Sequence, residues 1–172
     1  MCQAEGMDVQ RSHTFAAPIE AVLAMLGDAD ATTAKYDGMG HRDIEIIDCT
    51  ATDDTLHVES KRVVDVDLPG FAQKFLKPTN TMHQTDDWTR NADGTWKGSF
   101  GVDVEGAPVQ LSGIMSLVPG DGTCTQDVTI TMNVKVPLVG GKIADWVGKN
   151  DAVRTLEAEY AFGDTWLADH PA

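Results

Sequence analysis

The residues of this sequence best suited to chemistry are polar side chains on otherwise apolar strand faces. Successive side chains of an extended segment alternate between two faces, and this alternation places Arg11 and His13 among apolar neighbours in the first predicted strand. It does the same for Arg62, Gln84 and Gln126 in later strands. An unpaired buried polar group costs roughly 1–3 kcal/mol, and a lone buried charge costs more. We therefore predict that these groups line a cavity, where water or the polar end of a ligand satisfies them.

Local motifs for metal binding or nucleophilic catalysis do not accompany these groups. The five histidines are scattered and form neither an HxH nor an HExxH pattern, so we expect no metal and no cofactor. Cys2, Cys49 and Cys124 are an odd number without zinc-like spacing, which predicts unpaired thiols in a reduced, cytoplasmic protein. A plainer alternative for the polar groups stays open: each lies near a strand end and reaches solvent, or Arg62 pairs with an acidic side chain.

Charge and hydropathy exclude several classes of partner. The chain has 172 residues, with 27 acidic and 13 basic side chains and a net charge of −14. Such a surface repels phosphate backbones and anionic lipids, so we expect no nucleic-acid partner. No apolar run approaches the roughly 18–20 residues that cross a bilayer, so we expect no stable membrane insertion. For the oligomeric state, we expect a monomer or weak dimer. Several acidic residues flank or alternate with apolar positions, and we therefore assign them to the solvated convex face of the sheet. They are Asp65, Asp67, Asp86, Asp103 and Asp127.

The elements that must position the polar groups follow from periodicity. Alternation predicts a strand over 7–15, and Pro18 with the apolar spacing after it predicts a helix that ends near Leu26, followed by a short helix over 29–36. Between residues 42 and 136 the sequence reads as long strands joined by tight turns, of which Asp93-Gly94 is the clearest. Long antiparallel strands of this kind are typical of one strongly curved sheet. The predicted strands are 42–50, 55–66, 79–90, 95–104, 109–118 and 123–136.

The C-terminal segment changes from strand to helix periodicity. Pro137 has no N–H to donate and ends the last strand. Apolar residues then recur at three- and four-residue steps, interrupted only near Asn150, which predicts a helix over 138–168, roughly 45 Å long at 1.5 Å per residue. Only the concave face of the sheet is large enough to cover its apolar stripe. Gly148 and Gly163 weaken the isolated helix and allow close approach to the sheet or bending.

This order of elements is that of the helix-grip fold, and the chain resembles the START-like, or SRPBCC, superfamily. Short motifs resemble more closely the actinobacterial DUF2505 family of unknown function. These are Asp87-Trp88-Thr89 with the later Asp93-Gly94, then Gly113, the 136–143 junction and Trp166-Leu167. The resemblance implies a single α+β domain over 1–172, with a curved antiparallel seven-stranded sheet (β-α-α-β6-α) wrapped around a long C-terminal helix. It also implies a deep cavity for lipids, sterols, polyketides or hydrophobic hormones, but no reaction.

We therefore expect binding or carriage of a hydrophobic small molecule in an internal cavity, without catalysis. The alternatives are a cyclase- or hydrolase-type enzyme that uses His13 with an inward carboxylate or Arg62, and an interaction module with a filled core. The segment 68–78 is expected to act as a mobile lid or as a plug at one end. The residues predicted to bind the ligand are Arg11, His13, Arg62, Met82, Gln84, Phe100, Leu111, Met115, Gln126, Val128, Ile130, Met132, Ile143 and Val147.

Overall fold

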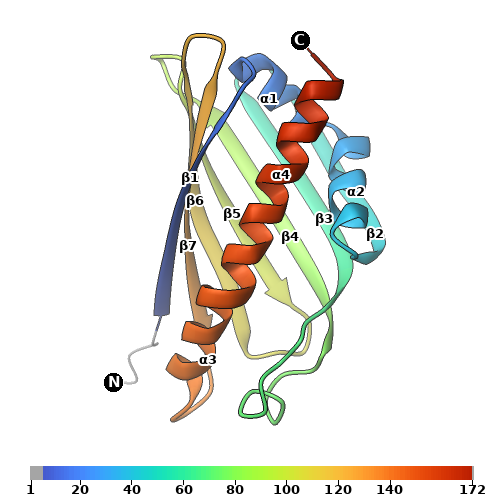
Figure 1. The fold of residues 1–172 in the computed structure, drawn as a ribbon, viewed down its shortest axis with the longest axis vertical. Helices are drawn as coiled ribbons and strands as arrows, with labels where there is room; N and C mark the ends of the chain where they lie inside the picture. The colour runs from blue at the N-terminus through green and yellow to red at the C-terminus, as the bar shows by residue number, and fades with distance from the viewer. Residues whose placement is uncertain (1–5, 172) are drawn as a thin grey trace.

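The sheet is a single antiparallel layer in which the first strand joins the last. The computed structural model describes residues 6–171, and its seven strands lie in the order β1-β7-β6-β5-β4-β3-β2 (Figure 1). Only β1 pairs out of sequence order, with Gly6 opposite Asn133 and Phe15 opposite Cys124. The strands are β1 (Gly6–Phe15), β2 (Arg42–Ala51), β3 (Thr55–Asp65), β4 (Thr79–Arg90), β5 (Trp96–Val104), β6 (Val109–Pro119) and β7 (Cys124–Val134).

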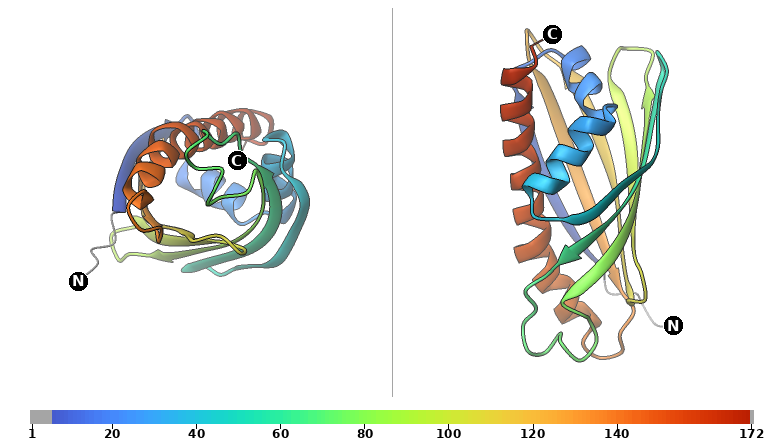
Figure 2. Two further views of the ribbon diagram at one scale, coloured as in Figure 1. Left: turned by 90° about the horizontal axis from the view of Figure 1, so that it is seen from below. Right: turned by 90° about the vertical axis from the view of Figure 1, so that its right-hand side faces the viewer.

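The helices lie on the concave side of this sheet. Seen from below, the sheet curls around and the C-terminal helix runs along its open side (Figure 2). Two short helices, α1 (Ile19–Leu26) and α2 (Ala29–Gly38), connect β1 to β2 and pack against the C-terminal helix. Asp28 begins α2, because its carboxylate accepts the N–H of Ala31 at 2.9 Å. The curved seven-stranded sheet around a long C-terminal helix is confirmed.

The C-terminal helix is continuous but changes its winding where the sequence pattern is interrupted. It consists of α3 (Gly140–Trp146), a π-helical turn η1 (Val147–Ala152) and α4 (Val153–Asp169). Within the turn, Asn150 donates from Nδ2 to the Trp146 carbonyl at 2.9 Å. The last strand ends at Val134, two residues earlier than predicted. In residues 6–171 no helix is long and apolar enough to span a bilayer.

Two glycines on the concave face make room for aromatic rings from the neighbouring strand. Trp88 lies opposite Gly98, and a Cβ at residue 98 would come within 2.7 Å of the Trp88 ring. Phe100 lies opposite Gly113, where a Cβ would come within 2.2 Å of the Phe100 ring and 2.6 Å of the Thr129 carbonyl. The inner side of a strongly curved sheet is crowded, and the missing side chains let both rings lie flat against it.

We predict that Gly113→Ala destabilises the protein by about 1–3 kcal/mol, because the new methyl group overpacks the concave face. The backbone oxygen of Thr129 cannot swing aside as a flexible side chain would. Gly101→Ala is the matched control, since Gly101 lies on the adjacent strand and a Cβ there meets nothing within 4 Å. The control is expected to change the free energy of unfolding by less than about 0.5 kcal/mol. Urea denaturation measures both, and equal effects would contradict the prediction.

Candidate functional site

A cavity of about 790 Å³ lies between the concave face of the sheet and the C-terminal helix. Its walls come from β3 to β7, from α2 with the turn after it, and from η1 and α4. The volume lies within the range of about 300–1,000 Å³ that is usual for small-molecule sites. The helix therefore covers the sheet without filling the space beneath it.

Most of the residues predicted to bind a ligand lie on the wall of this cavity. β6 and β7 contribute a largely apolar wall, and β3 and β4 contribute the polar groups. That these residues bind a ligand stays a prediction. The predicted residues on the wall are Arg62, Met82, Gln84, Phe100, Leu111, Met115, Gln126, Val128, Ile130 and Val147.

The remaining predicted residues do not line the cavity. Arg11 lies on the edge strand β1, where its guanidinium is exposed and donates to the Gln10 carbonyl at 2.7 Å. His13 is also on β1, where it packs against α4. Met132 and Ile143 are fully buried where α3 packs against β7 and β1. Strand and helix periodicity assigned all of these side chains to the inner face, but the cavity does not extend along the whole of that face.

His13 belongs to a packed cluster between β1 and α4. Its ring stacks on Tyr160 with a centroid distance of 4.6 Å, and its Nε2 lies 2.9 Å from Oδ1 of Asp164. Burial raises the pKa of Tyr160 to about 12. The predicted pairing of His13 with a cavity carboxylate or with Arg62 is therefore absent from the described part of the chain.

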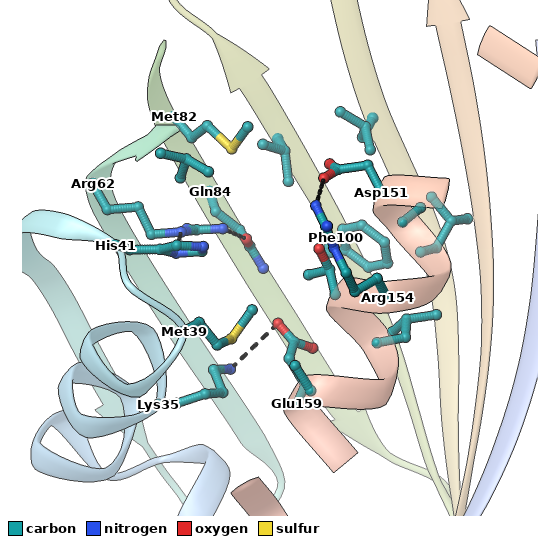
Figure 3. Close-up of a pocket in the computed structure, with 18 of the residues that line it drawn as sticks. Lys35, Met39, His41, Arg62, Met82, Gln84, Phe100, Asp151, Arg154 and Glu159 are labelled. Carbon is teal, nitrogen blue, oxygen red and sulfur yellow. Dashed lines mark hydrogen bonds and ion pairs between the residues drawn. The ribbon is translucent and has the colours of Figure 1, made fainter. Parts of the chain in front are cut away.

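Arg62 is the centre of the polar side of the cavity, and only 4 % of its surface is exposed. Its Nε donates to Nδ1 of His41 at 3.1 Å, and its Nη2 donates to Oε1 of Gln84 at 2.8 Å (Figure 3). The guanidinium carbon lies 3.8 Å from the centre of the Tyr36 ring, a cation–π contact. These contacts hold the guanidinium at one place on the wall.

His41 was not among the predicted site residues, although it lies beside Arg62. Burial lowers the pKa of His41 to about 4, helped by the positive charges of Arg62 and Lys35. The imidazole is therefore neutral at pH 7. Because its Nδ1 accepts a hydrogen bond from Arg62, its proton is on Nε2. His41 lies just after α2, outside any predicted strand or helix, so the sequence pattern did not indicate that its side chain belongs to the site.

Asp86 lies in the cavity, so its predicted place on the convex face is wrong. It shares the inner face of β4 with Gln84 and Trp88, and its Oδ1 accepts from Nε2 of Gln84 at 2.9 Å. Burial raises the pKa of the Asp86 carboxyl group, although the hydrogen bond from Gln84 and the charge of Lys35 oppose this. The alternation along β4 contains the signal, since residues 84, 86 and 88 share a face.

An ion pair between α2 and α4 adjoins the polar groups. The Nζ of Lys35 lies 3.9 Å from Oε1 of Glu159, and both residues line the cavity (Figure 3). Burial by itself lowers the pKa of Lys35, but the negative charges of Tyr36 when ionised, of Glu159 and of Asp86 raise it overall. Lys35 therefore stays charged at neutral pH. Sequence reasoning missed both residues, because they come from helices whose relative orientation only the tertiary structure defines.

The segment between β3 and β4 covers one end of the cavity. Leu68 and Leu76 line the cavity, and Phe71 packs against the core with its ring 4.1 Å from Nζ of Lys142. Phe75, by contrast, is 42 % exposed. A mobile lid and a fixed plug would both occupy this position. That the segment moves stays a prediction.

The cysteines and the other metal-ligating side chains form no second site in residues 6–171. Cys49 donates from Sγ to the Gly27 carbonyl at 3.1 Å, and burial raises the pKa of Cys124 to about 11. Neither is in a disulfide, and Cys2 lies outside the described residues. No group of three or more His, Cys, Asp or Glu side chains in the same range could hold a metal ion.

We predict that His41 makes the protein less stable in mild acid. The unfolded chain binds a proton at His41 as the pH falls through 6.5, whereas the folded chain does so only near 4. Between these values acid therefore favours the unfolded state, and this contribution to stability decreases as the pH falls. His41→Gln keeps an acceptor for Arg62 but does not titrate. Urea denaturation from pH 7.5 to 4.5 should show a steeper loss of stability in the wild type, and parallel curves would contradict the prediction.

Comparison with known proteins identifies the family and the fold. The family model described as "Protein of unknown function (DUF2505)" matches residues 10–167. An uncharacterized protein of Mycobacterium tuberculosis is 23% identical over 121 residues, which cover 69% of each chain. A crystal structure of a Thermus thermophilus protein has a TM-score of 0.62 at 14% identity and covers 95% of this chain and 99% of that one. Norcoclaurine synthase from Thalictrum flavum, as a point mutant, has a TM-score of 0.59 at 15% identity, with 99% of both chains covered. These neighbours have the Bet v 1-like helix-grip fold, and this chain, which shares that fold, belongs to the DUF2505 family.

Proposed function

We propose that this protein binds a hydrophobic small molecule between its curved sheet and its C-terminal helix. The observation that carries the proposal is the cavity of about 790 Å³. Its apolar wall is formed by side chains such as Leu111, Met115, Val128 and Ile130 from β6 and β7. Binding sites of this kind combine a largely apolar surface with a few polar groups that fix orientation.

The expected affinity comes from removing apolar ligand surface from water. A ligand that buries roughly 300 Å² of apolar surface gains roughly 7 kcal/mol at about 25 cal/mol per Å². The loss of ligand freedom on binding subtracts several kcal/mol from this gain. Methionine side chains, here Met82 and Met115, suit such a wall because they adapt to irregular shapes.

The site geometry favours binding over the alternatives, and one fold neighbour supports a small-molecule site. Norcoclaurine synthase, which shares the fold, has been solved in complex with dopamine and hydroxybenzaldehyde. An interaction module with a filled core does not fit a cavity of this volume. The enzyme based on His13 loses its main support, since His13 does not line the cavity and its ring contacts Tyr160 and Asp164.

We predict that Met115→Trp weakens ligand binding because the indole occupies part of the cavity. N-phenyl-1-naphthylamine, a neutral apolar dye, serves as the probe, and its fluorescence reports binding. The variant is expected to bind the dye about tenfold more weakly, corresponding to about 1.4 kcal/mol of steric cost. Ile114→Trp is the matched control, because Ile114 is the adjacent residue on the opposite face of β6 and is 68% exposed. It should bind the dye as the wild type does.

Native mass spectrometry of freshly purified wild-type protein complements the dye titration. Supporting results are dye binding that depends on residue 115, or a co-purified lipid-like molecule that Met115→Trp loses. If the wild type neither binds the dye nor carries such a molecule, the proposed function is wrong. Equal weakening by both tryptophan variants would show that the dye binds elsewhere.

A further inference from the structure

The guanidinium of Arg62 has hydrogen-bonding capacity that the protein does not use. Its Nη1 is shielded from solvent and has no hydrogen-bond partner among residues 6–171. A guanidinium carries N–H donors on all three nitrogens, and within residues 6–171 only Nε and Nη2 of Arg62 donate a hydrogen bond. A buried donor without a partner is costly, and more so when it is charged. Arg62, which lines the cavity, therefore carries a charged donor that no group in residues 6–171 satisfies.

The positive charge of Arg62 also lacks a directly bound counter-ion in the described part of the chain. Its hydrogen-bond partners are the amide of Gln84 and the imidazole of His41, which is neutral at pH 7. Gln84 links Arg62 to the carboxyl group of Asp86 through two hydrogen bonds. Lys35 and Glu159 face each other and balance their own charges. Burying a cation in this way is unfavourable unless an anion pairs with it.

The groups around Arg62 hold its side chain in position but leave room for a ligand head group beside it. The Tyr36 ring packs against the guanidinium at 3.8 Å and against His41 at a centroid distance of 5.6 Å, which fixes both side chains. The Nε2–H of His41 makes no hydrogen bond to residues 6–171 and supplies another donor. Met39 and Met82, which both line the cavity, lie on either side of this pair (Figure 3). Their unbranched thioether chains can shift to admit a head group.

We propose that the ligand of this cavity is an amphipathic anion whose carboxylate or similar oxyanion pairs with Arg62. The inference rests on the proposed function and adds the chemical class of the ligand. Nη1 of Arg62 donates to one oxygen of the anion, Nε2 of His41 donates to the head group, and the apolar remainder lies along β6 and β7. The net charge of −14 opposes anion binding at the outer surface, so selectivity for an anion has to come from the interior.

Two dyes with the same apolar body provide the test. N-phenyl-1-naphthylamine is neutral, and 8-anilinonaphthalene-1-sulfonate is the same framework with a sulfonate. Titrations at pH 7.5 and 0.15 M NaCl limit the long-range repulsion by the acidic surface. The wild type is expected to bind the sulfonate at least about tenfold more tightly, the effect of one hydrogen bond from a charged group. Arg62→Met should remove this preference while retaining affinity for the neutral dye.

Arg154→Met is the matched control. Arg154 also lines the cavity, but its side chain is 71% exposed and pairs with Asp151 at 3.3 Å. Its loss should leave the preference for the anion intact. A second measurement needs no variant: decanoate should displace the neutral dye from the wild type at about tenfold lower concentration than decanamide does. This comparison keeps the inference testable if Arg62→Met does not fold.

The possible outcomes separate this inference from the proposed function. If the neutral dye binds and the sulfonate binds no more tightly, the cavity takes apolar ligands but the anion assignment is wrong. If the preference survives Arg62→Met or disappears in Arg154→Met, the pairing of the anion with Arg62 is wrong. If neither dye binds the wild type, the proposed function and the inference are both wrong.

Discussion

The structure depends on the packing of the C-terminal helix along β1 and β7 at one edge of the sheet, which leaves the helix separated from β4 and β5 by the cavity. At Gly163 a Cβ would come within 2.7 Å of the Phe15 ring and 3.4 Å of the Met25 side chain, so the backbone of α4 packs closely on these side chains of β1 and α1. Farther toward its N-terminus the same helix faces β4 and β5 across the cavity. The π-helical turn at 147–152 lies in that stretch. The close packing on β1 and α1 stabilises the fold, and the separation of the helix from β4 and β5 leaves the cavity.

The polar side of the cavity reduces the stability of the folded chain. Arg62, Asp86, Lys35 and Glu159 all lie where apolar side chains would pack with less desolvation cost. Burial shifts the protonation equilibrium of Asp86 toward the neutral acid and keeps His41 neutral. Such groups are expensive to bury and are common where a protein recognises a ligand. The contrast with the apolar wall from β6 and β7 gives the cavity two chemically different halves.

Strand alternation predicted the sheet well because in most strands one face is more buried than the other. In β7 every second residue from Cys124 to Val134 is buried, as the sequence pattern requires. Alternation failed for Arg11 because β1 is an edge strand and its inner face is only partly covered. The pair formed by Lys35 and Glu159 could not be predicted, since two helices distant in sequence meet only through tertiary packing. Asp86 could have been found, because it shares its face with Gln84 and Trp88.

The pairing of β1 with β7 has a consequence for how the chain folds. Gly6 lies opposite Asn133, so β1 can pair with β7 only after the residues between them have been synthesised. Until then both backbone edges of β1 are unpaired and its apolar residues, including Val9 and Phe15, lack most of their final neighbours. Contacts between such distant segments slow folding because a long loop has to close first. The nascent chain therefore passes through a period in which its earliest strand is exposed to association with other chains.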